Sequence, residues 1–119
     1  MNLLRVKEIL RAQVICGEEY LDKEVYLVGA TDLMSDALCL LEGGALLLTG
    51  LVSVQVVRTA ELLDLVGVVF VRGKVPSNDI IELAKKANIP LLSTKYPMYE
   101  ACGRLYMAGF KGKKVEVDS

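Results

Sequence analysis

The side chains best suited to chemistry in this sequence are hydroxyls and cations that directly follow apolar runs. Three short loops hold them, together with glycines that let a ligand approach the backbone: Thr49 and Gly50; Arg72, Gly73 and Lys74; Ser93, Thr94 and Lys95. Cationic side chains and the N–H groups at helix starts bind phosphates and carboxylates. The loops therefore predict a site for a small anionic ligand, with Asp32, Ser35 and Asp36 as additional candidates.

Each of these residues also has an ordinary structural interpretation. Ser, Thr and Asp at helix starts are usually caps, and glycines are usually turns. Capping is therefore the more common role for Asp32 and for the hydroxyls. A cap does not explain the cations Arg72 and Lys74, so for them both interpretations stay open.

Asp32 and Asp36 lie one helical turn apart, where two carboxylates can share Mg²⁺ or accept protons. Two acids near a helix start also stabilise the helix dipole. Dedicated magnesium sites usually need substrate phosphates as well. We predict no metal and no cofactor.

The composition excludes several classes of function. The chain has 119 residues and no histidine, which removes Ser-His and Cys-His nucleophile pairs and histidine-containing zinc sites. Its 14 basic and 15 acidic residues give a net charge of −1, which is not the charge of a nucleic-acid-binding protein. Apolar residues make up 53%, too many for a disordered segment. With no catalytic constellation in the sequence, we do not expect an enzyme.

Two known motifs are only partly matched. The segment 67–74 differs from a P-loop because five residues, not four, separate its glycines and Val75 replaces the metal-binding hydroxyl. A receiver domain needs an aspartate at the end of a central strand, where this sequence has Arg72.

The elements that must position the loops alternate along the chain. Apolar runs predict strands over 25–28, 45–48, 67–71 and 89–92, after a short apolar piece at 14–16. Amphipathic spacing predicts five helices. The first has Val6, Ile9, Leu10 and Gln13 on its buried face, and the second, over 33–41, is capped by Asp32 and has Leu33, Ala37, Leu40 and Leu41 inward. The others lie over 54–65, capped by Ser53, over 77–87, ended by Asn88, and from Pro97 to Gly109. Such alternation predicts one three-layer α/β/α domain over residues 1–119, with a mostly parallel sheet. Ligands of these sheets bind beyond the carboxyl ends of the strands, at a switch in strand order.

The cysteines, the charges near the N-terminus and the apolar stretch 37–57 indicate the cellular compartment of the protein. Cys16, Cys39 and Cys102 are odd in number and far apart, which favours a reducing compartment and buried thiols. Charges near the N-terminus break any signal-peptide pattern, and glycines divide the apolar stretch 37–57. We therefore predict a cytoplasmic protein that binds neither membrane nor nucleic acid.

The apolar content of so short a chain favours self-association or a protein partner. The last helix carries residue types that are enriched at interfaces, namely Met98, Tyr99, Tyr106 and Met107. We predict a homo-oligomer, with a dimer favoured.

Several strings of this sequence resemble DRTGG-domain proteins over nearly the whole chain: 32–36, 48–51, 57–61, 71–74, 91–96 and 100–106. The stretch 14–25 resembles the start of the N-terminal domain of HPr serine kinase/phosphorylase. The literal DRTGG string is absent, and the P-loop domain of the kinase is not matched, so kinase activity is not implied.

The resemblance implies an α/β/α domain like the N-terminal domains of HPr kinase and MurF. Related domains occur beside phosphotransacetylase and CBS domains in regulatory settings, and stand-alone members accompany iron hydrogenase and NADH-dehydrogenase-like subunits in anaerobes. Our leading hypothesis is a non-catalytic regulatory or sensory domain that binds a nucleotide- or phosphate-like anion at the C-terminal edge of the sheet. The alternative is a ligand-free accessory or assembly subunit of an anaerobic redox (hydrogenase-like) or metabolic enzyme complex.

Overall fold

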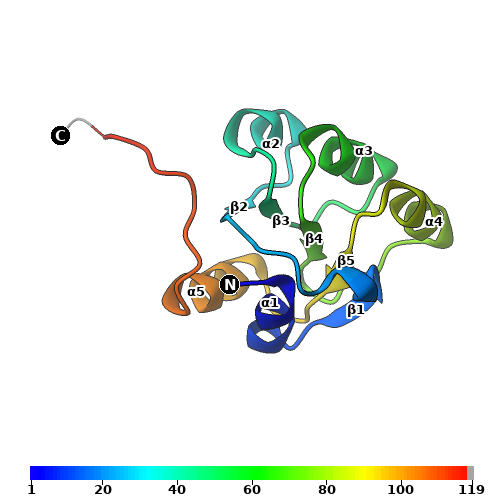
Figure 1. Ribbon diagram of the computed structural model, residues 1–119, viewed down its shortest axis with the longest axis horizontal. Coiled ribbons are helices and arrows are strands. Elements are labelled where there is room, and N and C mark those ends of the chain that lie inside the picture. Colours follow the sequence, from blue (N-terminus) through cyan, green and yellow to red (C-terminus); the bar gives the residue numbers. More distant parts are fainter. Residues whose placement is uncertain (118–119) are drawn as a thin grey trace.

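The computed structural model describes residues 1–117 and shows a five-stranded sheet with helices on both faces (Figure 1). The strand order is β1-β5-β4-β3-β2. Four strands are parallel, namely β2 (Leu27–Ala30), β3 (Ala45–Thr49), β4 (Gly67–Phe70) and β5 (Leu91–Ser93), while β1 (Gln13–Cys16) pairs antiparallel with β5. The predicted three-layer fold with a mostly parallel sheet is confirmed.

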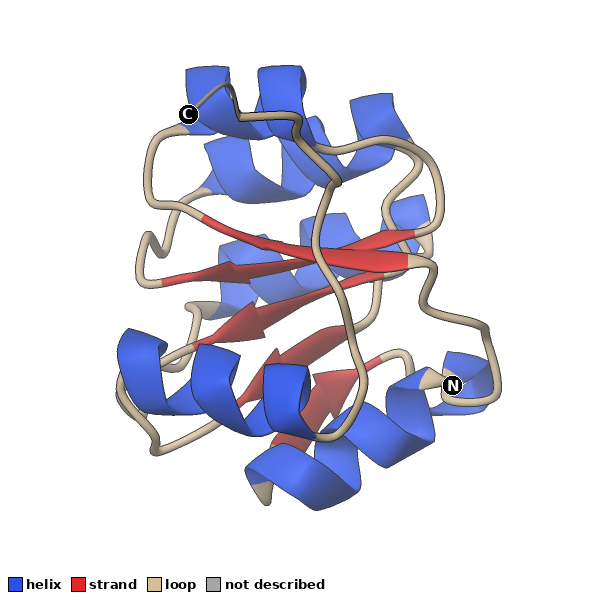
Figure 2. Ribbon diagram, turned by 90° about the vertical axis from the view of Figure 1, so that its left-hand side faces the viewer, coloured by secondary structure: helices blue, strands red, loops and turns tan. Residues whose placement is uncertain are grey.

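Helices cover the two faces of the sheet in separate groups, as Figure 2 shows above and below the strands. One face carries α2 (Met34–Leu40), α3 (Val54–Leu63) and α4 (Asn78–Ala87), and the other carries α1 (Leu3–Leu10) and α5 (Met98–Met107). A short 3₁₀ turn, η1 (Glu18–Tyr20), follows β1. Successive right-handed crossovers from β2 to β5 place their three helices on the same face.

The four parallel strands stand in the sheet in their chain order. The expected switch in strand order is therefore absent between β2 and β5. The carboxyl ends of all four strands nevertheless meet at one edge, because they are parallel. The loops that the sequence singled out follow those ends.

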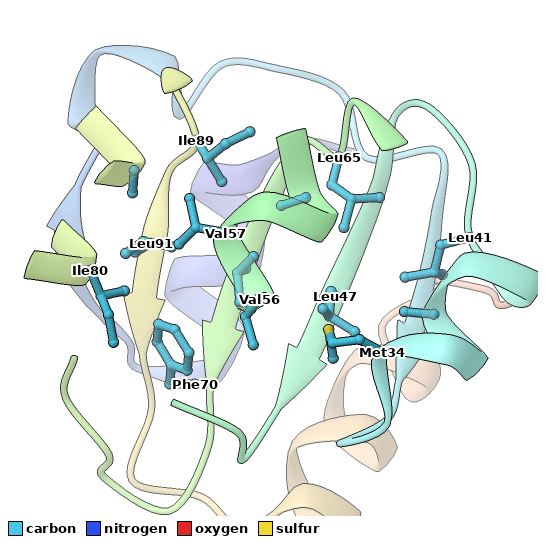
Figure 3. Packing of buried hydrophobic residues seen from close by; sticks show 14 of the residues in the cluster. Met34, Leu41, Leu47, Val56, Val57, Leu65, Phe70, Ile80, Ile89 and Leu91 are labelled. Carbon is cyan, nitrogen blue, oxygen red and sulfur yellow. The ribbon is translucent and has the colours of Figure 1, made fainter. Parts of the chain in front are cut away.

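Each face of the sheet has its own apolar core. Between the sheet and α2, α3 and α4, the side chains of Leu47 from β3, Phe70 from β4 and Val56 from α3 are all fully buried (Figure 3). On the other face, Leu46 and Leu105 are buried in the cluster that includes α1 and α5. Alternate residues of β3 thus enter opposite cores, which is why the strand appears as an unbroken apolar run.

Local signals set most helix ends correctly. Ser53 Oγ accepts a hydrogen bond from the Gln55 N–H at 3.2 Å, as a cap at the start of α3 should. Asn88 ends α4 in the left-handed conformation, with φ 58°. Pro97 precedes α5 directly, and Gly109 follows its end with φ 107°.

The predicted inward face of α2 is partly wrong. Leu33 and Leu40 are exposed, whereas Met34, Ala37 and Leu41 are buried. Met34, Ala37 and Leu41 follow the i, i+3, i+7 spacing, so only one of the two apolar faces of this helix meets the sheet. A Cβ on Gly29 of β2 would meet the Leu41 side chain, so that glycine opens the space that Leu41 fills.

Two other placements differ from expectation. Gln13 does not extend the first helix, because Arg11 ends it in the left-handed conformation and Gln13 begins β1. Cys39 is exposed rather than buried, while Cys16 is buried and Cys102 partly so. No helix within residues 1–117 is long and apolar enough to cross a membrane.

Candidate functional site

The loops after the four parallel strands are joined by a continuous series of hydrogen bonds, which we call the edge network. The Asp32 carboxylate, after β2, accepts from the Thr49 hydroxyl at 3.1 Å and from the Gly50 N–H at 2.6 Å. The Lys74 ammonium, after β4, donates to the Gly50 carbonyl at 2.7 Å. The Ser93 hydroxyl donates to the Lys74 carbonyl, also at 2.7 Å. Every strand end on this edge is therefore tied to its neighbour.

Asp32 does not have the role that its position suggested. It was expected to cap α2, but the residue that precedes this helix is Leu33, which makes no side-chain cap. Its carboxylate reaches instead to the loop after β3, 17 and 18 residues further along the chain. The role of Asp32 is to hold two strand ends together.

A second set of contacts fixes the loop that carries Arg72. The Arg72 N–H donates to the Tyr96 carbonyl at 2.9 Å, and the Gly73 N–H donates to the Thr94 carbonyl at 2.8 Å. Both Arg72 and Gly73 have positive φ, 60° and 69°. For an arginine this backbone conformation is strained, so the surrounding contacts must hold it. The side chain of Arg72 is left exposed.

The three hydroxyls of the predicted site are buried and already engaged. Thr49 is 0%, Thr94 1% and Ser93 7% exposed. Thr94 donates to the Leu10 carbonyl at 2.7 Å, which ties β5 to the end of α1. Because a hydroxyl has one proton, none of the three has a free donor for an anion while these bonds persist. Nothing in the local sequence signalled the contact between Thr94 and Leu10.

The three cations differ from the hydroxyls in being accessible. Arg72 and Lys95 are exposed and Lys74 is partly buried. Within residues 1–117, none of them forms a salt bridge with an acidic side chain. The edge therefore has three positive charges, of which Lys74 bonds to the Gly50 carbonyl while Arg72 and Lys95 are exposed. One carboxylate, Asp32, lies beside them and accepts from the Gly50 N–H.

The remaining candidates lie apart from the edge network. Ser35 and Asp36 are exposed in the first turn of α2. In the described part of the chain, no group of three or more Asp, Glu, Cys or His side chains is arranged to hold a metal ion.

Fold and site together define a class, that of small α/β/α domains with loops converging at the carboxyl edge of a parallel sheet. The DRTGG domain family model matches residues 5–108, and the chain belongs to that family. Among solved structures, one that is similar contains the CBS and DRTGG domains of the regulatory region of Clostridium perfringens pyrophosphatase, complexed with its activator diadenosine tetraphosphate. No curated protein matches the chain.

The likeness to the pyrophosphatase region has a TM-score of 0.68 at 23% sequence identity. It covers 87% of this chain but only 45% of that one, so the chain spans less than half the length of its structural relative. At this identity the likeness shows the shared fold. The expected similarity to the N-terminal domain of HPr kinase stays a prediction.

Proposed function

We propose that this chain is a non-catalytic regulatory domain that binds a nucleotide- or phosphate-like anion at the carboxyl edge of its sheet. Arg72, Lys74 and Lys95 contact the anion, and the edge network holds the loops that carry them. The observation that carries the proposal is the group of three accessible cations that have no acidic partner among residues 1–117, all placed on hydrogen-bonded strand ends.

The structure also suggests how the roles divide within the site. Lys74 donates to the Gly50 carbonyl, which holds its ammonium over the edge without neutralising it. The guanidinium of Arg72 can donate hydrogen bonds to two phosphate oxygens at once, and the ammonium of Lys95 adds a compact positive charge. Thr49, Gly50, Gly73, Ser93 and Thr94 act behind them, as the backbone and hydroxyl contacts that fix the loops.

The family supports a regulatory role. In the pyrophosphatase of Clostridium perfringens, a region of CBS and DRTGG domains is complexed with a dinucleotide polyphosphate activator. That ligand is rich in phosphates, which cationic side chains such as those at this edge can recognise. It is therefore the first probe to test.

The experiment is calorimetric titration of the protein with diadenosine tetraphosphate, ATP, AMP and inorganic phosphate. The test variant is Arg72→Ala/Lys74→Ala, and the matched control is Arg58→Ala/Lys86→Ala, which removes two exposed cations from α3 and α4. Charge-assisted contacts contribute about 1.5–3 kcal/mol each, so the test variant, which loses two of them, should lose about a hundredfold or more in affinity. The control should bind as the unmodified protein does. Equal binding by both variants contradicts the site.

The alternative function, an accessory subunit without a small ligand, depends on a different surface. It draws on the exposed side chains of α5, none of which takes part in the edge network. Titrations that show no binding of any of the four probes, combined with a protein partner held through α5, would favour it over the regulatory domain.

A further inference from the structure

The outward face of α5 carries several large apolar side chains that are exposed. Tyr99 and Met107, with 92% and 91% of their surface exposed, are the most exposed large hydrophobic residues in the described chain. Tyr106, the residue before the last of α5, is 60% exposed. With Cys102 and Gly103 they line a shallow groove of about 530 Å³, which we call the α5 groove. Tyrosine and methionine are enriched at protein interfaces, so this face fits a protein partner.

The pattern of side chains along the groove is symmetric about its centre. Tyr99, Gly103 and Tyr106 follow the i, i+4, i+7 spacing and form one stripe. Gly103 lies between the two aromatic residues, and a Cβ built on it would meet no atom within 4 Å. A glycine inside a helix lowers helix stability, and at this open point it lets another backbone approach closely.

We propose that the occupant of the α5 groove is a second copy of this chain, whose α5 packs antiparallel across a two-fold axis. The axis passes between Cys102 and Gly103. This arrangement places Tyr99 of each copy against Tyr106 of the other, and Cys102 of each against Gly103 of the other. An interface that uses the same patch twice must be self-complementary in this way.

The charges at the rim of the groove complement each other in the same arrangement. Glu100 and Arg104 are joined by a salt bridge of 2.9 Å within one chain. The same axis, between residues 102 and 103, brings Glu100 of each copy to within one residue of the position opposite Arg104 of the other, so opposite charges lie near each other on both sides. A parallel arrangement would instead place like charges together.

The length of the helix sets the strength of the interaction. Ten residues of α-helix extend about 15 Å, which gives an interface at the low end of the size range for specific complexes. The dimer is therefore reversible, with dissociation in the micromolar range or weaker. This inference does not depend on the anion site, because none of its residues belongs to the edge network.

The first test is sedimentation equilibrium over a wide range of concentration, with the 13.0 kDa monomer as reference. The chain should approach twice that mass as concentration rises. Tyr99→Arg should raise the dissociation constant on the order of tenfold or more, because it places a charge against Tyr106 of the other copy inside the interface. Leu62→Arg, a change at a 75% exposed leucine of α3, is the matched control and should leave the dimer unchanged.

The second test is geometric. Gly103→Cys, in a Cys39→Ser/Cys102→Ala background, should form a disulfide-linked dimer on mild oxidation, because residue 103 lies beside the axis. Arg58→Cys on α3, in the same background, should remain unlinked. Anion titration of Tyr99→Arg, at a concentration where both the variant and the unmodified chain are monomeric, separates this proposal from the site above, since the variant should then bind the anion as the unmodified chain does.

Two results would overturn the proposal. A chain that stays monomeric at every concentration, without crosslinking at position 103, would mean that a second copy does not occupy the α5 groove. A dimer that Tyr99→Arg leaves intact would mean that the copies associate through another surface.

Discussion

Asp32 offers the sharpest test of how the candidate site is built. Its carboxylate accepts from the Thr49 hydroxyl, which is fully buried, and from the N–H of Gly50, which is also buried. Asp32→Ala leaves both donors without their acceptor. A buried donor that loses its partner costs about 1–3 kcal/mol. Because Asp32 itself is exposed, water can reach the vacated position, and we expect a loss of about 1–2 kcal/mol in the free energy of unfolding.

The companion change is Thr49→Val, which keeps the shape of the side chain and removes the hydroxyl. It leaves the Leu51 N–H without its acceptor and Asp32 with one donor fewer. We again expect a loss of about 1–2 kcal/mol. Because the two side chains bond to each other, the double variant should lose less than the sum, with an interaction energy of about 0.5–1 kcal/mol.

Urea unfolding of the four proteins of this cycle measures that interaction energy. Asp36→Ala is the control, since Asp36 is an exposed acid in the same segment, and it should change stability by less than about 0.5 kcal/mol. If Asp32 were a cap of α2, it would be independent of Thr49 and the two losses would add. Additivity within about 0.3 kcal/mol, or an Asp32→Ala variant as stable as Asp36→Ala, would therefore refute the edge network.

Three further predictions concern the backbone and the thiols. Gly17→Ala should destabilise the fold by about 2 kcal/mol or more in urea unfolding, because Gly17 has φ 84° and an added Cβ would lie 2.6 Å from Pro90 Cα. A variant as stable as the unmodified chain would contradict this contact. Arg72→Gly should lower the anion affinity and leave the fold equally stable or up to about 1 kcal/mol more stable, since glycine relieves the backbone strain at φ 60°. A loss of stability would show that the Arg72 side chain supports the fold. Burial raises the pKa values of Cys16 and Cys102 above their ordinary 9.0. The stability that these neutral thiols contribute is therefore complete below about pH 9 and falls as the pH rises beyond it. In unfolding measured from about pH 8 to 10.5, the variant Cys16→Ala/Cys102→Ala should show a smaller decline.

The central strands were predictable because burial on two faces leaves a simple signature. Leu46, Leu47 and Leu48 alternate between two cores, and all three are fully buried. Only a sheet with helices on both faces gives every residue of a strand an apolar environment. Parallel strands then require their carboxyl ends to share one edge. The convergence of the candidate loops thus followed from the sequence.

The partners within that edge were not predictable, because local and distant hydrogen bonds use the same residue types. An aspartate before a helix fits a cap, and an aspartate that ties two strands together has the same neighbours in sequence. Asp32 ties the two strand ends together because the Gly50 N–H lies within hydrogen-bond distance of its carboxylate once β2 and β3 are paired. Similarly, the apolar residues of α2 offered two faces, and the space above Gly29 selected the one with Leu41.

The edge network and the α5 groove are physically connected through the segment between β5 and α5. The Arg72 N–H donates to the Tyr96 carbonyl, and the ring of Tyr96 lies 4.2 Å from the guanidinium of Arg104. Arg104 in turn pairs with Glu100 at the rim of the groove. A ligand that shifts Tyr96 on binding must therefore alter the rim charges of α5. Coupling between two binding sites is reciprocal. If the anion changes the dimer affinity by some factor, dimerisation changes the anion affinity by the same factor. A domain that binds an anion at one edge and a second copy at α5 would in this way report the ligand as a change in assembly.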